Sequence, residues 1–489
     1  MTSESPADQR DVRLAKLAKL REVGINPYPG RFPKTHTLAE AKGLPEGTKV
    51  RIAGRMMTVR VMGKLSFATL GDQHGRMQIS VSQEDVGETF YKDVWKKLVD
   101  LGDFIGVEGE LWITKTGEPT IKAASVTFLG KTLRPLPEKW HGLTDREGCW
   151  RQRYLDLAMN PETVDRFRFR TKFISALRRV LDGDGFMEID TPILSTKASG
   201  AAARPFKSWH NSLAMDVFLR IAPETYLKRA VVGGLEKVYE IARCFRNEGM
   251  DPSHLQDFSM LEWYAAYWDW TDNMAFTERL IRSAVLETTG STEVVLADGT
   301  KVDFGGTWPR VSFRELIKKD AEIDIEAFPD ATSLRAAIRA RGLEVEDMDV
   351  LGRGNLIDAL YKKVSRPKLV GPLFLCEHPI DLSPLARRND AQPHLTDRFQ
   401  VVVKGWEIVN AYSELVDPID QRRRFEEQAA LKAGGDEDAM DMDEDYLLAM
   451  EHGMPPISGF GMGIDRIVAL LTGADNLRDV VLFPLLRPN

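Results

Sequence analysis

The sequence predicts an α+β protein in which a small β-barrel precedes a larger domain built on an antiparallel sheet. Three observations support this prediction. Five short segments of strand composition follow one another between about residues 49 and 131. Beyond about residue 144, strands are joined by loops and helices come in blocks, which is typical of antiparallel α+β sheets. The chain of 489 residues, 43% of them hydrophobic, is long enough for about three domains.

The five N-terminal strands have the layout of an oligonucleotide-binding barrel (OB-fold). They are VRIAGRMMTVRV, KLSFATLGD, GRMQISVS, FIGVEGELWIT and TIKAASVTFLG, with a helical stretch, ETFYKDVWKKLVDLG, between the third and fourth. Arg55, Phe67 and Gln78 lie on these strands and offer a cation, a stacking ring and an amide, the groups that read unpaired bases. A core position for Phe67 is equally compatible with the pattern, and a fold alone does not establish binding.

An amphipathic helix is predicted before the barrel, with apolar residues from Val12 to Val23 at near-helical spacing and Gly24 at its end. Its polar face is either a solvated surface or a patch for phosphates; it carries Arg10, Arg13, Lys16, Lys19 and Arg21. The expected organisation is a helical extension at 1–45, the barrel at 46–135, a proline-containing linker at 136–150, and a large domain at 151–489 with a mainly helical insertion around 289–371.

Composition and charge exclude several classes of protein. The net charge is −7, so a nucleic-acid partner has to be met by a local basic patch. Cys149, Cys244 and Cys376 form no C-x-x-C pair, which argues against a disulfide framework and a zinc site. The polar N-terminus has no apolar signal core, and no apolar run approaches the ~18 residues of a membrane span. We therefore expect a cytoplasmic protein without a membrane partner.

Polar groups at strand spacing mark a candidate site in IARCFRNEG and HLQDFSMLEWYAAY. Because strand side chains alternate between faces, Arg246 and Glu248 share one side. The next strand displays on one face Phe258, Met260, Glu262 and Tyr264. A salt-bridged sheet face would explain any single Arg–Glu pair. The whole set favours a binding surface, since uncompensated charges on a covered sheet face are costly.

Two further segments carry groups of the same kind. In KGWEIVNAYSELVDP, Asn410, Tyr412 and Glu414 share a strand face, whereas Glu407 is out of phase, so that either a bulge intervenes or this side chain points elsewhere. In SGFGMGIDRIVALLTG, a glycine-rich strand leads into a helix with Arg466 in its first turn, where a phosphate would meet free N–H groups and a guanidinium.

Alternative interpretations exist for two of these patterns. The G-x-G-x-G before the last helix, with Asp479 twenty residues beyond Gly459, also resembles a dinucleotide fingerprint, although its last glycine is missing. The acidic run GGDEDAMDMDEDY lacks the spacing of a calcium loop and predicts a solvated connection. Its acidic residues are Asp436, Glu437, Asp438, Asp441, Asp443, Glu444 and Asp445.

These motifs together resemble those of a class II lysyl-tRNA synthetase of the bacterial type. GFMEIDTPIL is similar to the dimer-forming first motif of that class, FRNEG with the following His and Phe to the second, and GFGMGIDR to the third. The lysine subgroup is marked by ARPF, RIAPETYLKR, SPLARRND and NAYSELVDP. The resemblance runs from the first helix to Arg487. It implies an anticodon-binding barrel, a class II catalytic domain, a homodimer, and L-lysine, ATP and tRNA(Lys), rather than DNA, as partners.

The resemblance also implies roles for individual residues. Arg246, Glu248 and Arg466 would be catalytic. The ATP site would comprise Arg246, Glu248, His254, Phe258, Glu407 and Arg466. The lysine site would comprise Gly200, Glu224, Arg246, Glu262, Tyr264, Asn410, Tyr412 and Glu414. The anticodon site would comprise Arg55, Phe67 and Gln78. Glu407 is the only Mg²⁺ ligand carried over, because Gln400 stands where the family has an acid.

Three other functions share parts of this pattern. An aspartyl- or asparaginyl-tRNA synthetase has the same architecture, but its pocket should present a cation where Glu414 stands. A ligase that transfers lysine to another protein would lack the barrel. A catalytically silent RNA-binding protein would not need Arg246 and Arg466. Lysine activation needs no general base, since the carboxylate that attacks the α-phosphate is already ionised at neutral pH.

Overall fold

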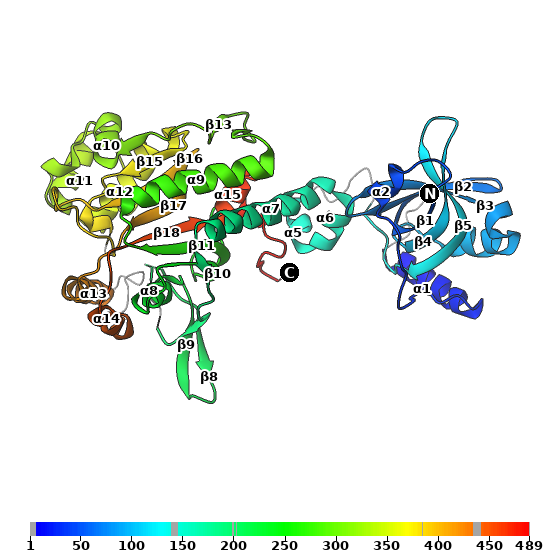
Figure 1. Cartoon of the computed structure of the whole chain (residues 1–489), viewed down its shortest axis with the longest axis horizontal. Helices are drawn as coiled ribbons and strands as arrows, with labels where there is room; N and C mark the ends of the chain where they lie inside the picture. Colours follow the sequence, from blue (N-terminus) through cyan, green and yellow to red (C-terminus); the bar gives the residue numbers. More distant parts are fainter. Residues whose placement is uncertain are drawn as a thin grey trace. The chain divides into compact units, whose positions relative to one another are not determined.

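Five strands of the N-terminal unit close into a barrel in the computed structural model, which describes residues 6–137, 145–197, 200–201, 203–383, 385–433 and 442–488 (Figure 1). The strand order is β1-β2-β3-β5-β4, with β4 returning to β1 and a single parallel pair between β3 and β5. The strands are β1 Lys49–Met62, β2 Leu65–Asp72, β3 Gly75–Ser82, β4 Phe104–Ile113 and β5 Pro119–Gly130. The predicted barrel is therefore confirmed.

Strand alternation builds the barrel core. Along β2, Ser66, Ala68 and Leu70 are buried while the residues between them are partly exposed. Apolar side chains from all five strands fill the interior, which isolates this core from water. The predicted helical stretch between the third and fourth strands comprises α3 (Gln83–Val86), a π-helix (Phe90–Trp95) and α4 (Lys96–Leu98).

The first helix, α1 (Pro6–Glu22), packs against this unit through Leu17 and Leu20. Two of its basic residues turn inward instead of facing solvent. Arg13 Nη1 donates to Thr132 Oγ1 at 2.6 Å, and Lys16 Nζ lies 2.6 Å from Asp100 Oδ1. The expectation of one continuous exposed basic face is therefore wrong for these two residues, because they dock the helix.

The second unit, Asp165–Asn489, is built on an eight-stranded sheet. The strand order is β14-β15-β16-β17-β18-β11-β10-β6, antiparallel except at the two outermost pairs. The strands are β6 Met187–Glu188, β10 Lys237–Phe245, β11 Asp257–Ala266, β14 Arg310–Ser312, β15 Leu373–Cys376, β16 Arg398–Val403, β17 Trp406–Ser413 and β18 Ile457–Gly463. A smaller sheet holds β7 Leu194–Ser195, β8 Lys207–His210 and β9 Met215–Leu219.

One face of the large sheet is covered by three helices, α7 (Pro161–Gly183), α9 (Trp270–Thr289) and α15 (Ile464–Leu471) (Figure 1). The main core lies between them and the sheet, where Trp263 and Phe460 stack with ring centroids 5.0 Å apart. Because side chains alternate along a strand, every second residue of β11, β17 and β18 faces away from this core. Those residues form the other face of the sheet.

The remaining helices lie at the edges of this unit. They are α8 Glu224–Val232, α10 Phe313–Ala321, α11 Ala331–Ala340, α12 Arg353–Val364, α13 Pro418–Ala433 and α14 Glu444–Glu451, whereas α5 Arg146–Arg151 and α6 Arg153–Met159 belong to the first unit. Helices α10 to α12 pack around their own apolar cluster against β15 and β16. The expected insertion is helical only from α10 onward, because a hairpin of β12 (Glu293–Val295) and β13 (Lys301–Asp303) and strand β14 precede it.

One sequence-based expectation is wrong here, and one disfavoured alternative is excluded. The stretch FMEIDTPIL is strand only at Met187–Glu188 and Leu194, since Pro192 cannot donate to a ladder. The dinucleotide interpretation is wrong, because β18 pairs antiparallel with both neighbours, whereas that fingerprint needs a parallel βαβ unit. Most of the acidic run lies outside the described residues. Asp443 caps α14, where its carboxylate accepts the Tyr446 N–H.

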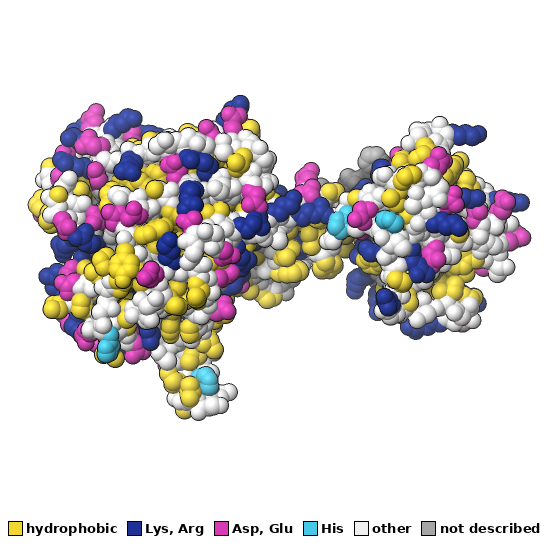
Figure 2. Space-filling view, in the orientation of Figure 1, with side chains coloured by type: hydrophobic (Ala, Val, Ile, Leu, Met, Phe, Trp, Pro, Cys, Tyr) yellow, Lys and Arg dark blue, Asp and Glu magenta, His cyan; other side chains and the backbone are white. Residues whose placement is uncertain are grey.

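Acidic and basic side chains are interspersed over the visible face of both units (Figure 2). This mixture accords with the small net charge of −7. Among the described residues, no helix combines the length and the apolar composition needed to cross a lipid bilayer.

Candidate active site

A cavity of about 380 Å³ opens on the face of the large sheet that points away from the main core. This volume is typical of sites for small ligands. Every residue predicted for the ATP and lysine sites lines it: Gly200, Glu224, Arg246, Glu248, His254, Phe258, Glu262, Tyr264, Glu407, Asn410, Tyr412, Glu414 and Arg466. The structure thus brings together residues that are up to 266 positions apart in the sequence.

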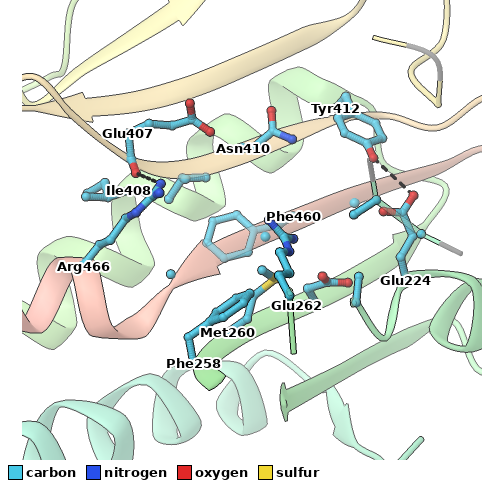
Figure 3. Close-up of a pocket in the computed structure, with 18 of the residues that line it drawn as sticks. Glu224, Phe258, Met260, Glu262, Glu407, Ile408, Asn410, Tyr412, Phe460 and Arg466 are labelled. Carbon is cyan, nitrogen blue, oxygen red and sulfur yellow. Dashed lines mark hydrogen bonds between the residues drawn. The ribbon is translucent and has the colours of Figure 1, made fainter. Parts of the chain in front are cut away.

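Three adjacent strands supply most of the cavity wall (Figure 3). On β11, Met260, Glu262 and Tyr264 point into the cavity while Leu261 and Trp263 enter the core. The shared face predicted for β11 is confirmed. Arg246 and Glu248 follow the end of β10 rather than lying on it, and Glu248 is exposed at the cavity rim.

A β-bulge explains why Glu407 points to the same side of β17 as Asn410 although the spacing of the two residues is odd. On β16, Val401 pairs with Val409 and Val402 pairs with Glu407, so that Ile408 is the extra residue of β17. The bulge turns Glu407 to the cavity side together with Asn410. Of the two alternatives that spacing left open, the bulge is correct.

One end of the cavity is cationic and aromatic (Figure 3). Arg466 Nη1 donates to the Glu407 carbonyl oxygen at 3.1 Å, and its Nη2 lies 3.3 Å from His254 Nε2. The Arg246 guanidinium lies 5.1 Å from the centroid of the Phe258 ring. Burial lowers the pKa of Arg466, which nonetheless stays charged. This end has the donors and the stacking ring that a nucleotide requires.

The opposite end is acidic and largely closed to water. Glu224, Glu262 and Glu414 converge there and are all buried. Tyr412 donates its hydroxyl to Glu224 Oε1 at 3.2 Å, and the Tyr264 hydroxyl lies 3.4 Å from Glu262 Oε2. Burial raises the pKa of Glu262 well above its usual range, and the neighbouring Glu224 adds to this rise. An incoming cation would relieve this repulsion.

Supporting residues hold the walls in place. Arg398 Nε donates to Asn410 Oδ1 at 2.8 Å, which fixes the amide of Asn410. Asp465, at the start of α15, accepts from Arg170 Nη1 at 2.5 Å and from the Ser259 N–H at 2.8 Å. Since Asp465 is buried, these bonds tie α7, β11 and α15 together behind the cavity.

The described residues contain no group of three or more His, Cys, Asp or Glu side chains arranged to hold a metal ion. Gln400 is buried and does not line the cavity, whereas Glu407 does. One carboxylate can hold Mg²⁺ when water and substrate phosphates complete its coordination. Glu407 therefore fits a metal that arrives with a nucleotide.

Sequence reasoning missed several residues of this site. The most important is Lys228, whose Nζ lies 2.5 Å from Glu224 Oε1 and 2.5 Å from Glu414 Oε2. Its spacing of four from Glu224 is the helical ion-pair signal and could have revealed it. Arg170 could not have been found in this way, because its partner Asp465 is 295 residues away.

The residues proposed for base reading lie on the outer face of the barrel. Phe67 is partly exposed between buried neighbours, so it is not a core residue. Gln78 donates to Thr120 Oγ1 at 2.8 Å, and the Arg55 guanidinium lies 4.3 Å from the centroid of the Phe104 ring. These side chains belong to neighbouring strands β1, β2 and β3, which makes them members of one surface.

Comparison with known proteins agrees with this architecture. Residues 145–487 match the family of tRNA synthetases class II (D, K and N), and residues 50–129 match an OB-fold nucleic acid binding domain. The chain is 48% identical to the lysine--tRNA ligase of Pelotomaculum thermopropionicum over 98% of this chain and 94% of that protein.

The chain belongs to the class II lysine–tRNA ligase family. The lysine--tRNA ligase of Moorella thermoacetica is 46% identical over 100% of this chain and 99% of its own length. That of Enterococcus faecalis is 46% identical over 98% and 97%, respectively. The family resemblance in the motifs is thus confirmed over both units of this lysine–tRNA ligase family member.

We expect the Asp465→Asn substitution to destabilise the second unit, because it removes the charge that compensates the buried end of Arg170. Removing one partner of such a buried pair costs about 3–5 kcal/mol. Urea unfolding followed by tryptophan fluorescence measures this loss. A free energy of unfolding that stays within about 0.5 kcal/mol of wild type would contradict the role given to this ion pair.

Proposed function

We propose that the protein is a lysine–tRNA ligase that activates L-lysine with ATP, releases pyrophosphate and transfers lysine to the 3′ end of tRNA(Lys). The observation that carries this proposal is one cavity with guanidinium groups and an aromatic ring at one end and three buried carboxylates at the other. A nucleotide and a cationic amino acid are the pair of substrates that matches these two ends.

The acidic end suits the side chain of lysine. Glu414, with Tyr264 beside it, would receive the substrate ammonium, while Asn410 and Tyr412 flank its aliphatic stem. Glu224 and Gly200 would receive the α-amino group, and Glu262 supports the pocket. Gly200 has a left-handed backbone with φ of +92° and lies close to Glu224, so a side chain there would crowd the site.

The other end suits ATP and the attack on its α-phosphate. Phe258 would stack on the adenine with Arg466, Glu248 would contact its edge, and His254 would reach the outer phosphates. Arg246, whose guanidinium lies 5.1 Å from the centroid of the Phe258 ring, would align the lysine carboxylate with the α-phosphate. Such alignment and neutralisation lower the barrier without any proton transfer. When Mg²⁺ is bound at Glu407, it neutralises charge on the phosphates.

Features outside the cavity support the remaining parts of the proposal. The outer face of β1 to β3 offers Arg55, Phe67 and Gln78 to the anticodon. Met187, Ile193 and Leu194 of the first motif are 45–52% exposed, which fits a surface covered by a second copy in a homodimer. A translation enzyme of this kind would work in the cytoplasm.

An aspartate-specific enzyme is the nearest competing function. Its substrate side chain is an anion, which three buried carboxylates would repel. Lys228, the cation that contacts two of these carboxylates from behind, is already paired with Glu224 and Glu414 and does not line the cavity. The observations therefore favour lysine.

Glu414→Gln tests the lysine site. It removes a buried charge while keeping the shape of the side chain, so we expect kcat/KM for lysine to fall at least ~100-fold. Lysine-dependent exchange between ATP and pyrophosphate measures this, in a screen that also contains aspartate, asparagine and arginine. Unimpaired lysine activation by the variant, or exchange driven by aspartate in the wild type, would refute the pocket assignment.

Two neighbouring glycines of β18 offer a matched pair of variants. A Cβ at Gly459 would overlap Glu414 Oε1 and the Tyr264 ring, whereas a Cβ at Gly461 would meet nothing closer than 3.8 Å. Gly459→Ala should therefore raise KM for lysine at least ~10-fold, and Gly461→Ala less than ~3-fold. Steady-state exchange kinetics compare them. Equal effects of the two variants would argue against a lysine site beside Gly459.

Phe67→Ala tests the division of labour between the two units. Loss of one stacking ring should weaken tRNA(Lys) charging by about 10-fold, because stacking contributes ~1–3 kcal/mol per base. Lysine activation should be unchanged, since the cavity belongs to the other unit. Aminoacylation and pyrophosphate exchange, assayed on one preparation, separate the two steps, and an equal loss of both would be the contrary result.

A further inference from the structure

A lysine of the chain itself is buried behind the acidic end of the cavity, against two of the carboxylates that line it. Lys228 lies on α8, one turn after Glu224, and its side chain is 1% exposed. Its Nζ bridges Glu224 Oε1 and Glu414 Oε2 at 2.5 Å each. Burying an ammonium group is costly unless it is paired. These two carboxylates are what allows a cation at this position.

Titratable side chains from four elements, α8, β11, β17 and α14, surround the ammonium of Lys228. They are Glu224 on α8, Glu262 and Tyr264 on β11, Tyr412 on β17, Glu414 just beyond β17, and Tyr446 on α14. The Nζ lies 5.6–5.9 Å from the centroids of the three tyrosine rings. Water is largely excluded from this cluster, so the charge of Lys228 is weakly screened and acts strongly on its neighbours.

The two oxygens of the Glu414 carboxylate have different surroundings. Oε2 faces Lys228. Oε1 lies beside Gly459 and the Tyr264 ring, as the overlap with a Cβ at position 459 shows. Among the described residues, neither oxygen has a hydrogen-bond partner of good geometry although both are buried, and Oε2 differs from Oε1 in its ion pair with Lys228 at 2.5 Å. The ammonium of Lys228 thus lies against Oε2, and Oε1 is an acceptor to which no described residue donates.

We propose that Lys228 is a positioning residue of the lysine site, which holds Glu414 by Oε2, favours the ionised form of this carboxyl, and leaves Oε1 as the acceptor for the ammonium of the substrate. The inference rests on the proposed function, since it concerns how that pocket selects lysine. Lys228 acts through Glu414 and needs no contact with the substrate.

The electrostatics of the pair agree with this role. Burial raises the pKa of Glu414 to about 8, the ammonium of Lys228 opposes that rise, and Glu224 adds to it. Without Lys228, burial and Glu224 would act unopposed, so that Glu414 would keep its proton to a higher pH. A protonated carboxyl attracts the substrate ammonium far less than a carboxylate does. Lysine binding would therefore weaken on the acid side and recover as the pH rises.

Lys228→Met is the decisive variant, because it removes the charge and keeps most of the volume. The pH dependence of kcat/KM for lysine, measured by pyrophosphate exchange from about pH 6.5 to about pH 10, reports the protonation of the free enzyme. We expect kcat/KM near pH 7 to fall at least ~10-fold, and the midpoint of its rise to move up by about one pH unit. The kcat and the KM for ATP should change less than ~3-fold.

Two matched variants separate charge from structure. Lys228→Arg keeps the cation and should keep the wild-type midpoint even if KM increases. Lys237→Met removes a partly buried lysine outside the cavity, whose Nζ lies 3.1 Å from the Asp184 carbonyl oxygen, and should leave the pH profile unchanged. If Lys228→Met fails to fold, Lys228→Gln replaces it in the comparison with Lys228→Arg.

The outcomes are distinguishable. A wild-type midpoint in Lys228→Met or Lys228→Gln would overturn the inference, and so would an upward shift of the same size in Lys228→Arg. In both cases lysine-dependent exchange by the wild type would leave the proposed function standing. Absence of that exchange in the wild type would overturn the proposed function and this inference with it.

Discussion

Charge compensation in a cavity closed to water is the constraint on which the catalytic unit depends. Three carboxylates converge at one end of the cavity, and such a cluster is stable only if cations and donors stand close by. Lys228 supplies a permanent cation, and the tyrosine hydroxyls supply donors. In the proposed function the substrate ammonium would complete the compensation, so that selectivity for a cationic amino acid would follow from the charge balance of this cluster.

The sheet makes this arrangement possible by giving each strand two separate tasks. On β11 and β18, the side chains on one face belong to the main core, and those on the other face line the cavity. The core face is rich in aromatic rings around Trp263 and packs against three helices. The glycines of β18 leave the space into which Glu414 extends. Rigid packing behind the sheet therefore fixes the groups in front of it.

Most of the correct predictions of the fold and of the candidate site came from strand periodicity. It placed Phe258, Glu262 and Tyr264 on one face and recognised the five barrel strands, because alternation and turn residues are local signals. It could not decide the direction of Glu407, since a bulge depends on the pairing partner. It also missed the inward turn of Arg13, whose partner Thr132 is 119 residues away. Errors of this kind arise where a tertiary contact overrides a local pattern.

The bulge at Ile408 has a consequence for how such a cavity can evolve. One strand, β17, contributes to both ends of the cavity, with Glu407 beside Arg466 at the cationic end and Asn410 and Tyr412 toward the acidic end. Because Ile408 is an extra residue, the alternation of side chains between the two faces restarts there, and the residues before and after it follow separate alternations. Substitutions after the bulge can therefore alter the side chains at the acidic end without changing the direction in which Glu407 points.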